Sequence, residues 1–318
     1  MQSLHENGCE NVAPDSFSFA SVLNALANSS EDGSAEKAEN ILHMQQQLYK
    51  DGNEKVKPNT ICFTTVIKAF SRSKSTGSAE RAESILKQMF EFHKEGNMDV
   101  QPNTITFTSV CNAWAKFNSP KAVRKVEELI VWMEDLSANG FKNVSPNAYT
   151  YNALITAVAR SKDPNKAAKA LAILRKMQEN PQLHINLFTY GNVMNACSFT
   201  HGTPSVRNQA LRTAVMILEE AVKTAGPKDR LNVIYGAFFQ ACSNLMQKEA
   251  EKVKIERIVE AVFHQCCERG QIDKMLLVQV RRSCSQQLFL RLFGHYKTFP
   301  NVNIRDIPAE WQTNVRKR

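Results

Sequence analysis

The sequence lacks several features that would assign it to a common class of protein. No run of about 18 or more apolar residues occurs, which excludes a membrane span. Its eight cysteines include no Cys-x-x-Cys pair, so a zinc ribbon and a disulfide scaffold are both disfavoured. A Gly-rich phosphate loop, a nucleophile elbow and an acidic nuclease cluster are also missing, so we predict no catalytic residues, no metal and no cofactor.

One cluster, His264 with Cys266 and Cys267, has the residue types of a metal site. Adjacent cysteines on a helix point about 100° apart, and the cluster does not have the spacing of a zinc deaminase. We therefore expect packed core thiols here. Cys197 and Cys242 share an otherwise apolar position and are expected in the core as well.

A repeat of 44 residues organises the chain. Its opening pairs are Pro14-Asp15, Pro58-Asn59, Pro102-Asn103 and Pro146-Asn147, followed by weaker copies at Ile185-Asn186 and Arg230-Leu231. Counted from each opening pair, the fourth residue is aromatic and the tenth is alanine. Apolar residues recur at positions seven, eight and eleven, which with position four give the spacing of an amphipathic helix.

A second helix is expected in each repeat, as in residues 79–92 and 122–136. Glycines near its end (Gly52, Gly96 and Gly140) are typical of a helix stop. Such hairpins bury their apolar faces by stacking. We therefore predict an all-α fold, a right-handed α-solenoid of about six repeats over residues 14–269, followed by a C-terminal helical cap and basic tail over 270–318. In the cap, we expect burial of Met275, Leu276, Val280, Leu288 and Leu292.

Residues 1–13 match the end of a second helix. Met1 and Leu4 are in register with Met133 and Leu136, 132 residues later. We interpret this segment as the remnant of a truncated repeat, in which case a targeting segment is missing from the chain. A capping half-repeat is the alternative.

Acidic residues are absent from the predicted first helices. The six 15-residue segments after the opening pairs contain no Asp or Glu, whereas acids gather in the second helices. Arg72, Lys116 and Arg160 share the thirteenth position, and we call them the basic column. Because first helices line one surface of a solenoid, this column is expected to contact the phosphates of a nucleic acid. A scatter of solubilising charges is the alternative.

These residues together resemble the pentatricopeptide repeat family. The match includes the Pro-Asn or Pro-Asp opening, the aromatic fourth residue, the inner alanine, and an alanine and methionine in the second helix, over about residues 1–269. The period of 44 is longer than is usual in the family. The units thus resemble the lengthened repeats of algal pentatricopeptide-like proteins and the pentatricopeptide region of protein-only RNase P.

The resemblance implies sequence-selective binding of single-stranded RNA, with one base per repeat. In the family, the fifth residue of the first helix and the last residue of the repeat read the base edge. The matching pairs here are Thr64 with Asn103, Thr108 with Asn147, and Asn152 with Asn186. The family's code assigns adenine to the first two pairs and a pyrimidine, with a preference for cytosine, to the third. Repeats two to four are thus expected to bind A-A-C, with the RNA running 5′ to 3′ from the N to the C terminus of the protein.

The second residue of each first helix sandwiches neighbouring bases in the family. This position holds Phe17, Ile61, Ile105, Tyr149, Phe188 and Val233, and we assign base sandwiching to Ile61, Ile105, Tyr149 and Phe188. Stacking of this kind contributes about 1–3 kcal/mol per base. Ordinary packing at the helix start is the alternative.

The resemblance also implies a place in organelle RNA processing, stability or translation, in a mitochondrion or plastid. A protein partner carrying a nuclease or other effector activity would then supply chemistry that this chain lacks. The competing interpretation is a protein-binding helical-repeat scaffold of the tetratricopeptide type, whose grooves hold peptides.

Overall fold

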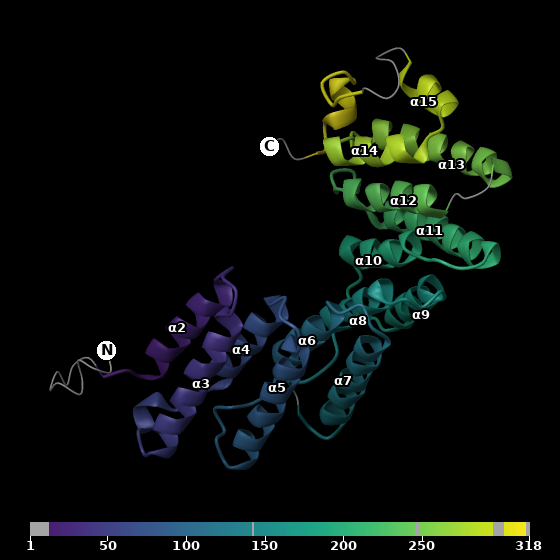
Figure 1. Ribbon diagram of the computed structural model, residues 1–318. Coiled ribbons are helices and arrows are strands. Elements are labelled where there is room, and N and C mark those ends of the chain that lie inside the picture. Colours follow the sequence, from purple (N-terminus) through teal and green to yellow (C-terminus); the bar gives the residue numbers. More distant parts are fainter. Residues whose placement is uncertain (1–12, 142, 246–248, 295–301, 316–318) are drawn as a thin grey trace. The chain divides into compact units, whose positions relative to one another are not determined.

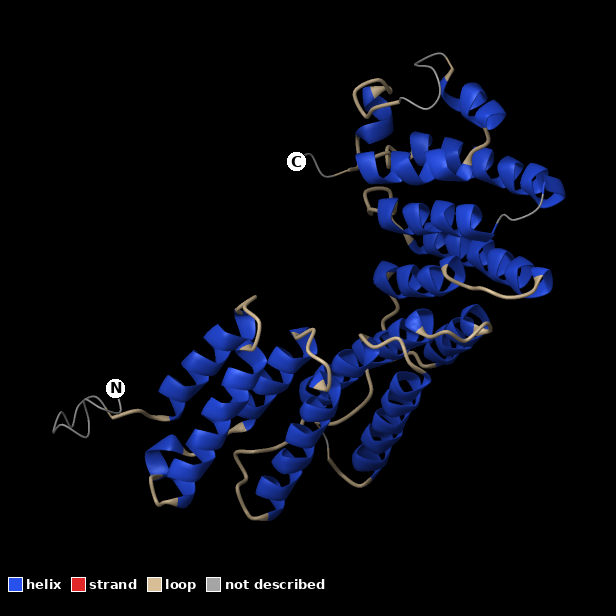
Figure 2. Cartoon of the chain, viewed as in Figure 1, coloured by secondary structure: helices blue, strands red, loops and turns tan. Residues whose placement is uncertain are grey.

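The structure is a computed structural model that describes residues 13–141, 143–245, 249–294 and 302–315 (Figure 1). Within these ranges it contains fourteen α-helices, two short 3-10 helices and no strand, which confirms the predicted all-α fold (Figure 2). The predicted remnant at residues 1–13 lies outside the described residues except for Ala13. The chain divides after Ala157, inside α8 (Ala148–Arg160), into two units that are described in turn.

The first unit consists of helical hairpins. They pair α2 (Ser16–Asn28) with α3 (Ser34–Lys50), α4 (Thr60–Arg72) with α5 (Ser78–Lys94), and α6 (Thr104–Ala115) with α7 (Pro120–Ala138). Helix α4 packs against α2 and α6 as well as against its partner α5. First helices therefore stack on first helices, as expected of a helical solenoid.

The second unit contains the same kind of arrangement. After α9 (Lys166–Glu179) it contains α10 (Leu187–Ser198), α11 (Pro204–Thr224), α12 (Asn232–Leu245), α13 (Glu249–Glu268), α14 (Lys274–Ser283), α15 (Gln286–Phe293) and the 3-10 helix η3 (Ala309–Gln312). Helix α12 packs against α10 on one side and against α14 on the other. Helix α14 is thus a further first helix, within the segment predicted to be a cap.

Local side-chain chemistry explains where the helices begin and end. Asn59 and Asn103 precede α4 and α6; the Asn59 side-chain oxygen accepts from the Ile61 and Cys62 N–H groups, and that of Asn103 accepts from the Thr106 N–H. Gly96 ends α5 with φ 97°, and the Asn97 N–H returns to the Phe92 carbonyl at 3.1 Å. Only glycine adopts this left-handed conformation without strain, so the predicted helix stop is confirmed there.

The long loops between repeats are anchored rather than loosely extended. The valine two residues before each of three opening pairs is fully buried (Val56, Val100 and Val144). The hydroxyl of Thr60 accepts a hydrogen bond from the Gln101 N–H at 2.8 Å, and the Thr104 hydroxyl accepts one from the Ser145 N–H at 3.0 Å. Each loop is therefore fastened to the start of the first helix of its own repeat.

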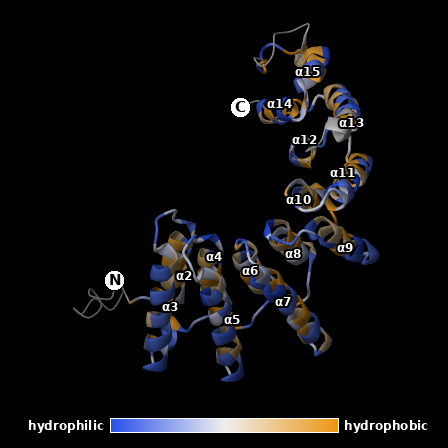
Figure 3. Ribbon diagram, turned by 45° about the vertical axis from the view of Figure 1, so that its right-hand side comes forward, coloured by the Kyte–Doolittle hydropathy of each residue, from blue (hydrophilic) through white to orange (hydrophobic). Residues whose placement is uncertain are grey.

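The repeated apolar positions form the core. All six aromatic fourth residues are buried: Phe19, Phe63, Phe107, Tyr151, Tyr190 and Tyr235. The alanines at the tenth position are buried from Ala69 onward, whereas Ala25 in α2 is exposed. Figure 3 shows mainly hydrophilic residues on the visible sides of α3 and α5, as expected of helices whose outer faces meet solvent.

The C-terminal segment packs onto α13. Leu276, Val280, Leu288 and Leu292 are buried as predicted. The ring of Trp311 meets that of Phe263 edge-on, with centroids 5.6 Å apart, and the Ile272 N–H donates to the Trp311 carbonyl at 2.8 Å. Residues around η3 therefore cover the end of α13.

Candidate nucleic-acid interface

A column of large apolar side chains is exposed at the second position of the first helices. Phe17, Ile61, Ile105, Tyr149, Phe188 and Val233 have exposed fractions between 56% and 78%. The aromatic residue two positions later is buried in every one of these helices. Exposed apolar side chains at one repeated position indicate a binding surface, and they argue against ordinary packing at the helix start.

The prediction that Met275 is buried is wrong, because this side chain is 69% exposed. It occupies the second position of α14, directly after Lys274, and so continues the apolar column of the preceding first helices. Asp273 caps α14 by accepting a hydrogen bond from the Leu276 N–H at 2.7 Å, as the last residue of a repeat does elsewhere. Sequence reasoning placed this helix in a cap and did not recognise it as a first helix, because its fourth residue is Leu277 instead of an aromatic residue and its tenth is Ser283 instead of alanine.

The two predicted adenine-reading pairs are each joined by a third residue. In one, the hydroxyls of Thr64 and Thr106 lie 2.9 Å apart, and the Thr106 hydroxyl lies 3.1 Å from Asn103 Oδ1. The linking threonine is fully buried at the third position of the next first helix. The residues of this predicted pair are therefore held together by one hydrogen-bonded chain.

The neighbouring repeat contains the same arrangement. The hydroxyls of Thr108 and Thr150 lie 3.0 Å apart, and the Thr150 hydroxyl donates to Asn147 Oδ1 at 3.2 Å. Recurrence in two successive repeats shows that the geometry follows from the repeat itself.

The third predicted pair is divided between the two units. Asn152 is buried in the first unit, and its Oδ1 has no hydrogen-bond partner among the described residues. Asn186 caps α10 in the second unit, where its Oδ1 accepts from the Thr189 N–H at 3.1 Å. The pairing of these two residues on one base stays a prediction.

The basic column lies at the C-terminal ends of first helices. Arg72 is the last residue of α4, Lys116 follows α6, and Arg160 ends α8 in the second unit. The Arg72 guanidinium donates to the Ala27 carbonyl at 2.8 Å and to Asn28 Oδ1 at 2.7 Å. Part of its charge therefore complements the negative end of the α2 dipole, in addition to any role toward phosphate.

Acidic residues of the flanking loops lie near the ends of the first helices. Glu31 and Asp32 belong to the loop after α2 and line the same surface hollow as Arg72. At the other end, Asp99 forms a 2.8 Å salt bridge with Lys57, which raises the pKa of that lysine through their hydrogen bond. The absence of acids is thus a property of the first helices and not of the loops that flank them.

The comparisons with known proteins agree with this geometry. Residues 134–198 match the model of the pentatricopeptide repeat domain, a segment that runs from the end of α7 through α8 and α9 to the end of α10. This match supports a protein of the pentatricopeptide repeat family. The other repeats of the chain carry the same columns in register with the matched segment. No curated protein matches the chain.

Pentatricopeptide repeats are RNA-binding helical repeats, and they constitute the matched segment of this chain. The match therefore implies RNA as the general class of partner.

Six cysteines of the described residues are buried, and Cys284 is half-buried; the buried ones are Cys62, Cys111, Cys197, Cys242, Cys266 and Cys267. Burial raises the pKa of the Cys266 thiol well above its ordinary value and that of Cys267 to about 12. Across the described ranges, no group of three or more His, Cys, Asp or Glu residues could hold a metal ion. The same part of the chain contains no helix with the length and apolar character needed to span a bilayer.

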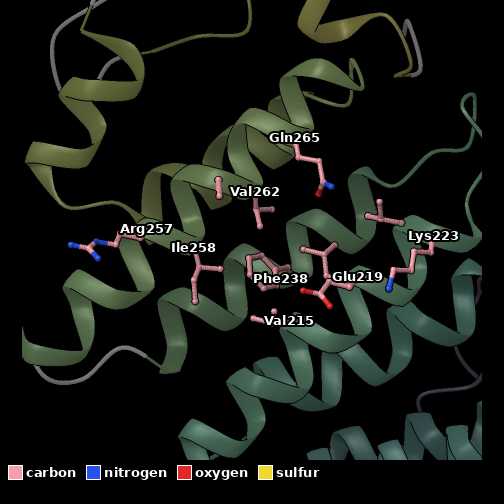
Figure 4. Close-up of a pocket in the computed structure, with 11 residues that line it drawn as sticks. Val215, Glu219, Lys223, Phe238, Arg257, Ile258, Val262 and Gln265 are labelled. Carbon is pink, nitrogen blue, oxygen red and sulfur yellow. The ribbon is translucent and has the colours of Figure 1, made fainter.

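A separate groove lies between the second helices α11 and α13. Figure 4 shows Val215 of α11, Phe238 of α12, and Ile258 and Val262 of α13 along its apolar lining. Glu219, Lys223 and Arg257 are the charged residues around it. This groove is distinct from the exposed apolar column, because its lining comes mainly from second helices.

Proposed function

We propose that this pentatricopeptide repeat protein binds single-stranded RNA sequence-selectively, with one base per repeat. The observation that carries the proposal is the exposed apolar column beside the hydrogen-bonded Thr64–Asn103 and Thr108–Asn147 pairs. An unpaired base can stack against second-position side chains while its edge meets the side chains of a reading pair. Repeats two to four would then bind A-A-C, with the RNA 5′ to 3′ along the protein from N to C terminus.

A filter-binding assay tests this proposal. It compares single-stranded RNA containing AAC with a scrambled RNA of equal composition and with a duplex, each over a series of salt concentrations. We expect a preference for the AAC strand of about tenfold, since a mismatched base typically costs ~1–3 kcal/mol. Equal binding of all three RNAs, or no binding, would contradict base reading by these repeats.

We further propose that the protein acts in a mitochondrion or plastid, in RNA processing, stability or translation, with a partner that carries a nuclease or another effector. Family resemblance supports this proposal. Immunodetection in purified organelle fractions is the measurement. Detection of the protein solely in cytosol or nucleus would contradict it.

The groove between α11 and α13 favours one alternative, a protein-binding scaffold of the tetratricopeptide type. Its lining is apolar and half-buried, which suits a peptide with an apolar face. The alternative predicts that Val262→Lys abolishes partner binding and that the protein shows no preference among RNAs. RNA selectivity that is unchanged in V262K would favour RNA binding by the first helices.

A further inference from the structure

The hydrogen-bonded chain through Thr106 has a defined direction. The Thr106 backbone N–H donates to Asn103 Oδ1 at 3.0 Å, so an oxygen and not the amide nitrogen must occupy that position. The Thr106 hydroxyl lies 3.1 Å from the same oxygen. Because Oδ1 has no hydrogen to give, Thr106 donates its single hydroxyl hydrogen there.

The direction of the hydrogen bond between Thr64 and Thr106 follows from that of the bond to Asn103. The hydroxyl oxygens of Thr64 and Thr106 are 2.9 Å apart, and the Thr106 hydrogen is already used. Thr64 must therefore donate to Thr106, which leaves the oxygen lone pairs of Thr64 for a ligand. Asn103 offers a ligand its Nδ2 hydrogens, because its Oδ1 faces the helix start.

The second chain has the same direction. The Thr150 backbone N–H donates to Asn147 Oδ1 at 3.1 Å, and the Thr150 hydroxyl points to the same atom. Thr108 then donates to Thr150 across 3.0 Å. Both linking threonines are fully buried, so neither hydroxyl can exchange its protein partner for water without a cost.

We propose that Thr106 and Thr150 are positioning residues that fix the direction of hydrogen bonding in each reading pair. Toward the ligand, Thr64 and Thr108 are then acceptors, and the paired asparagines are donors. This proposal rests on RNA binding by the reading pairs as proposed above. The ligand that fits is a base whose edge carries an amino group beside a ring-nitrogen acceptor, which is the edge of adenine or cytosine. Guanine and uracil present a carbonyl oxygen beside an N–H, so their oxygen would face the lone pairs of Thr64 or Thr108.

The test replaces both linking hydroxyls in Thr106→Val/Thr150→Val. The side-chain oxygens of Asn103 and Asn147 still accept from the backbone N–H groups of residues 106 and 150 in this variant, so the helix caps remain, although the Asn147 N–H loses its 3.3 Å bond to the Thr150 hydroxyl. Thr64 and Thr108 regain a free hydroxyl hydrogen and can donate to a carbonyl oxygen. We expect the preference for single-stranded RNA containing AAC over RNA containing GGC to fall by about tenfold, the size of one lost base-discriminating hydrogen-bond pattern.

Two control variants separate positioning from folding. Thr106→Ser/Thr150→Ser keeps both hydroxyls and should retain the preference of the unmodified protein. Thr213→Val removes a buried hydroxyl of α11 that bonds only to the Gln209 carbonyl of its own helix at 3.0 Å, and it should leave the preference unchanged.

The possible results are distinguishable. If the unmodified protein prefers AAC and the valine variant keeps that preference in full, the positioning role is overturned while RNA reading stands. The role is also overturned if the serine variant loses the preference as completely as the valine variant. A protein that shows no preference before any substitution would instead contradict the proposed function.

Discussion

At the scale of single residues, the reading positions combine two chemical tasks. Asn103 and Asn147 cap the helices that follow them and also belong to the predicted reading pairs. An asparagine can do both because its oxygen accepts from the helix start while its amide nitrogen stays a donor. The helix cap thus uses one end of this side chain, and the proposed base contact uses the other.

Substitution of a fifth-position threonine should change the base that is read. Thr108→Asn would replace a hydroxyl by an amide at a half-buried position and give repeat three the residues that the family associates with a pyrimidine. We expect preference at the corresponding base to move from adenine toward pyrimidine, measured by filter binding to RNAs that vary only there. An unchanged preference for adenine would show that Thr108 does not contact the base.

At the scale of elements, local sequence determines the helix ends most directly. Gly96 has φ 97°, and a Cβ there would meet no atom within 4 Å, so only the backbone conformation disfavours another residue. We expect Gly96→Ala to lower the free energy of unfolding by about 1–2 kcal/mol in urea denaturation. Gly191→Ala is the matched control, because Gly191 is helical and also has open space; it should raise stability by ~0.5–1 kcal/mol. Equal effects of the two substitutions would contradict this explanation.

Helix α14 extends the apolar column by one helix. We expect Met275→Ser to weaken binding of RNAs long enough to reach past repeat six, by about 1–3 kcal/mol if the side chain stacks on a base. Leu290→Ser in α15 is the control, since Leu290 is also an exposed apolar residue but does not belong to a first helix. Filter binding with RNAs shortened from the 3′ end measures the effect. Equal loss in both variants would exclude a specific role for Met275.

Some features of the helices could be predicted from the sequence, and others could not. Helix pairs, caps and glycine stops were predictable because each depends on residues adjacent in the chain. The exposure of Met275 was not, since Met275, Leu276 and Leu277 are successive apolar residues and composition does not tell which one faces solvent. The links from Thr64 to Thr106 and from Arg72 to Ala27 join different repeats, so they depend on the distance between stacked helices.

At the scale of the whole molecule, net charge is a poor guide to the binding surface. The chain has a formal charge of +9, but residues 1–268 hold 30 basic and 28 acidic residues. The excess lies mainly in the last 50 residues. What distinguishes the first helices is the exclusion of acidic residues and not an abundance of basic ones.

Removal of the basic column should weaken binding without changing sequence preference. We expect Arg72→Ala/Lys116→Ala/Arg160→Ala to lower affinity for every single-stranded RNA alike and to flatten the dependence of affinity on salt, because fewer counterions are released. Lys37→Ala/Lys87→Ala/Lys94→Ala removes the same charge from the second helices α3 and α5 and should have a smaller effect. Thermal melting of both variants controls for the contact of Arg72 with α2. A triple variant with normal affinity and salt dependence would show that the column does not meet phosphate.

Through the anchored loops, backbone hydrogen bonds join the beginning of a repeat to its end. The Thr60 N–H donates to the Asp99 carbonyl and the Thr104 N–H to the Asn143 carbonyl, both at 2.9 Å, so the beginning and end of a repeat meet each other. A unit closed in this way can be duplicated or deleted as a block without leaving the N–H that opens its first helix unpaired. The natural boundaries for such an exchange fall just before the opening prolines, and under the proposed binding of one base per repeat each exchange would lengthen or shorten the bound RNA by one base.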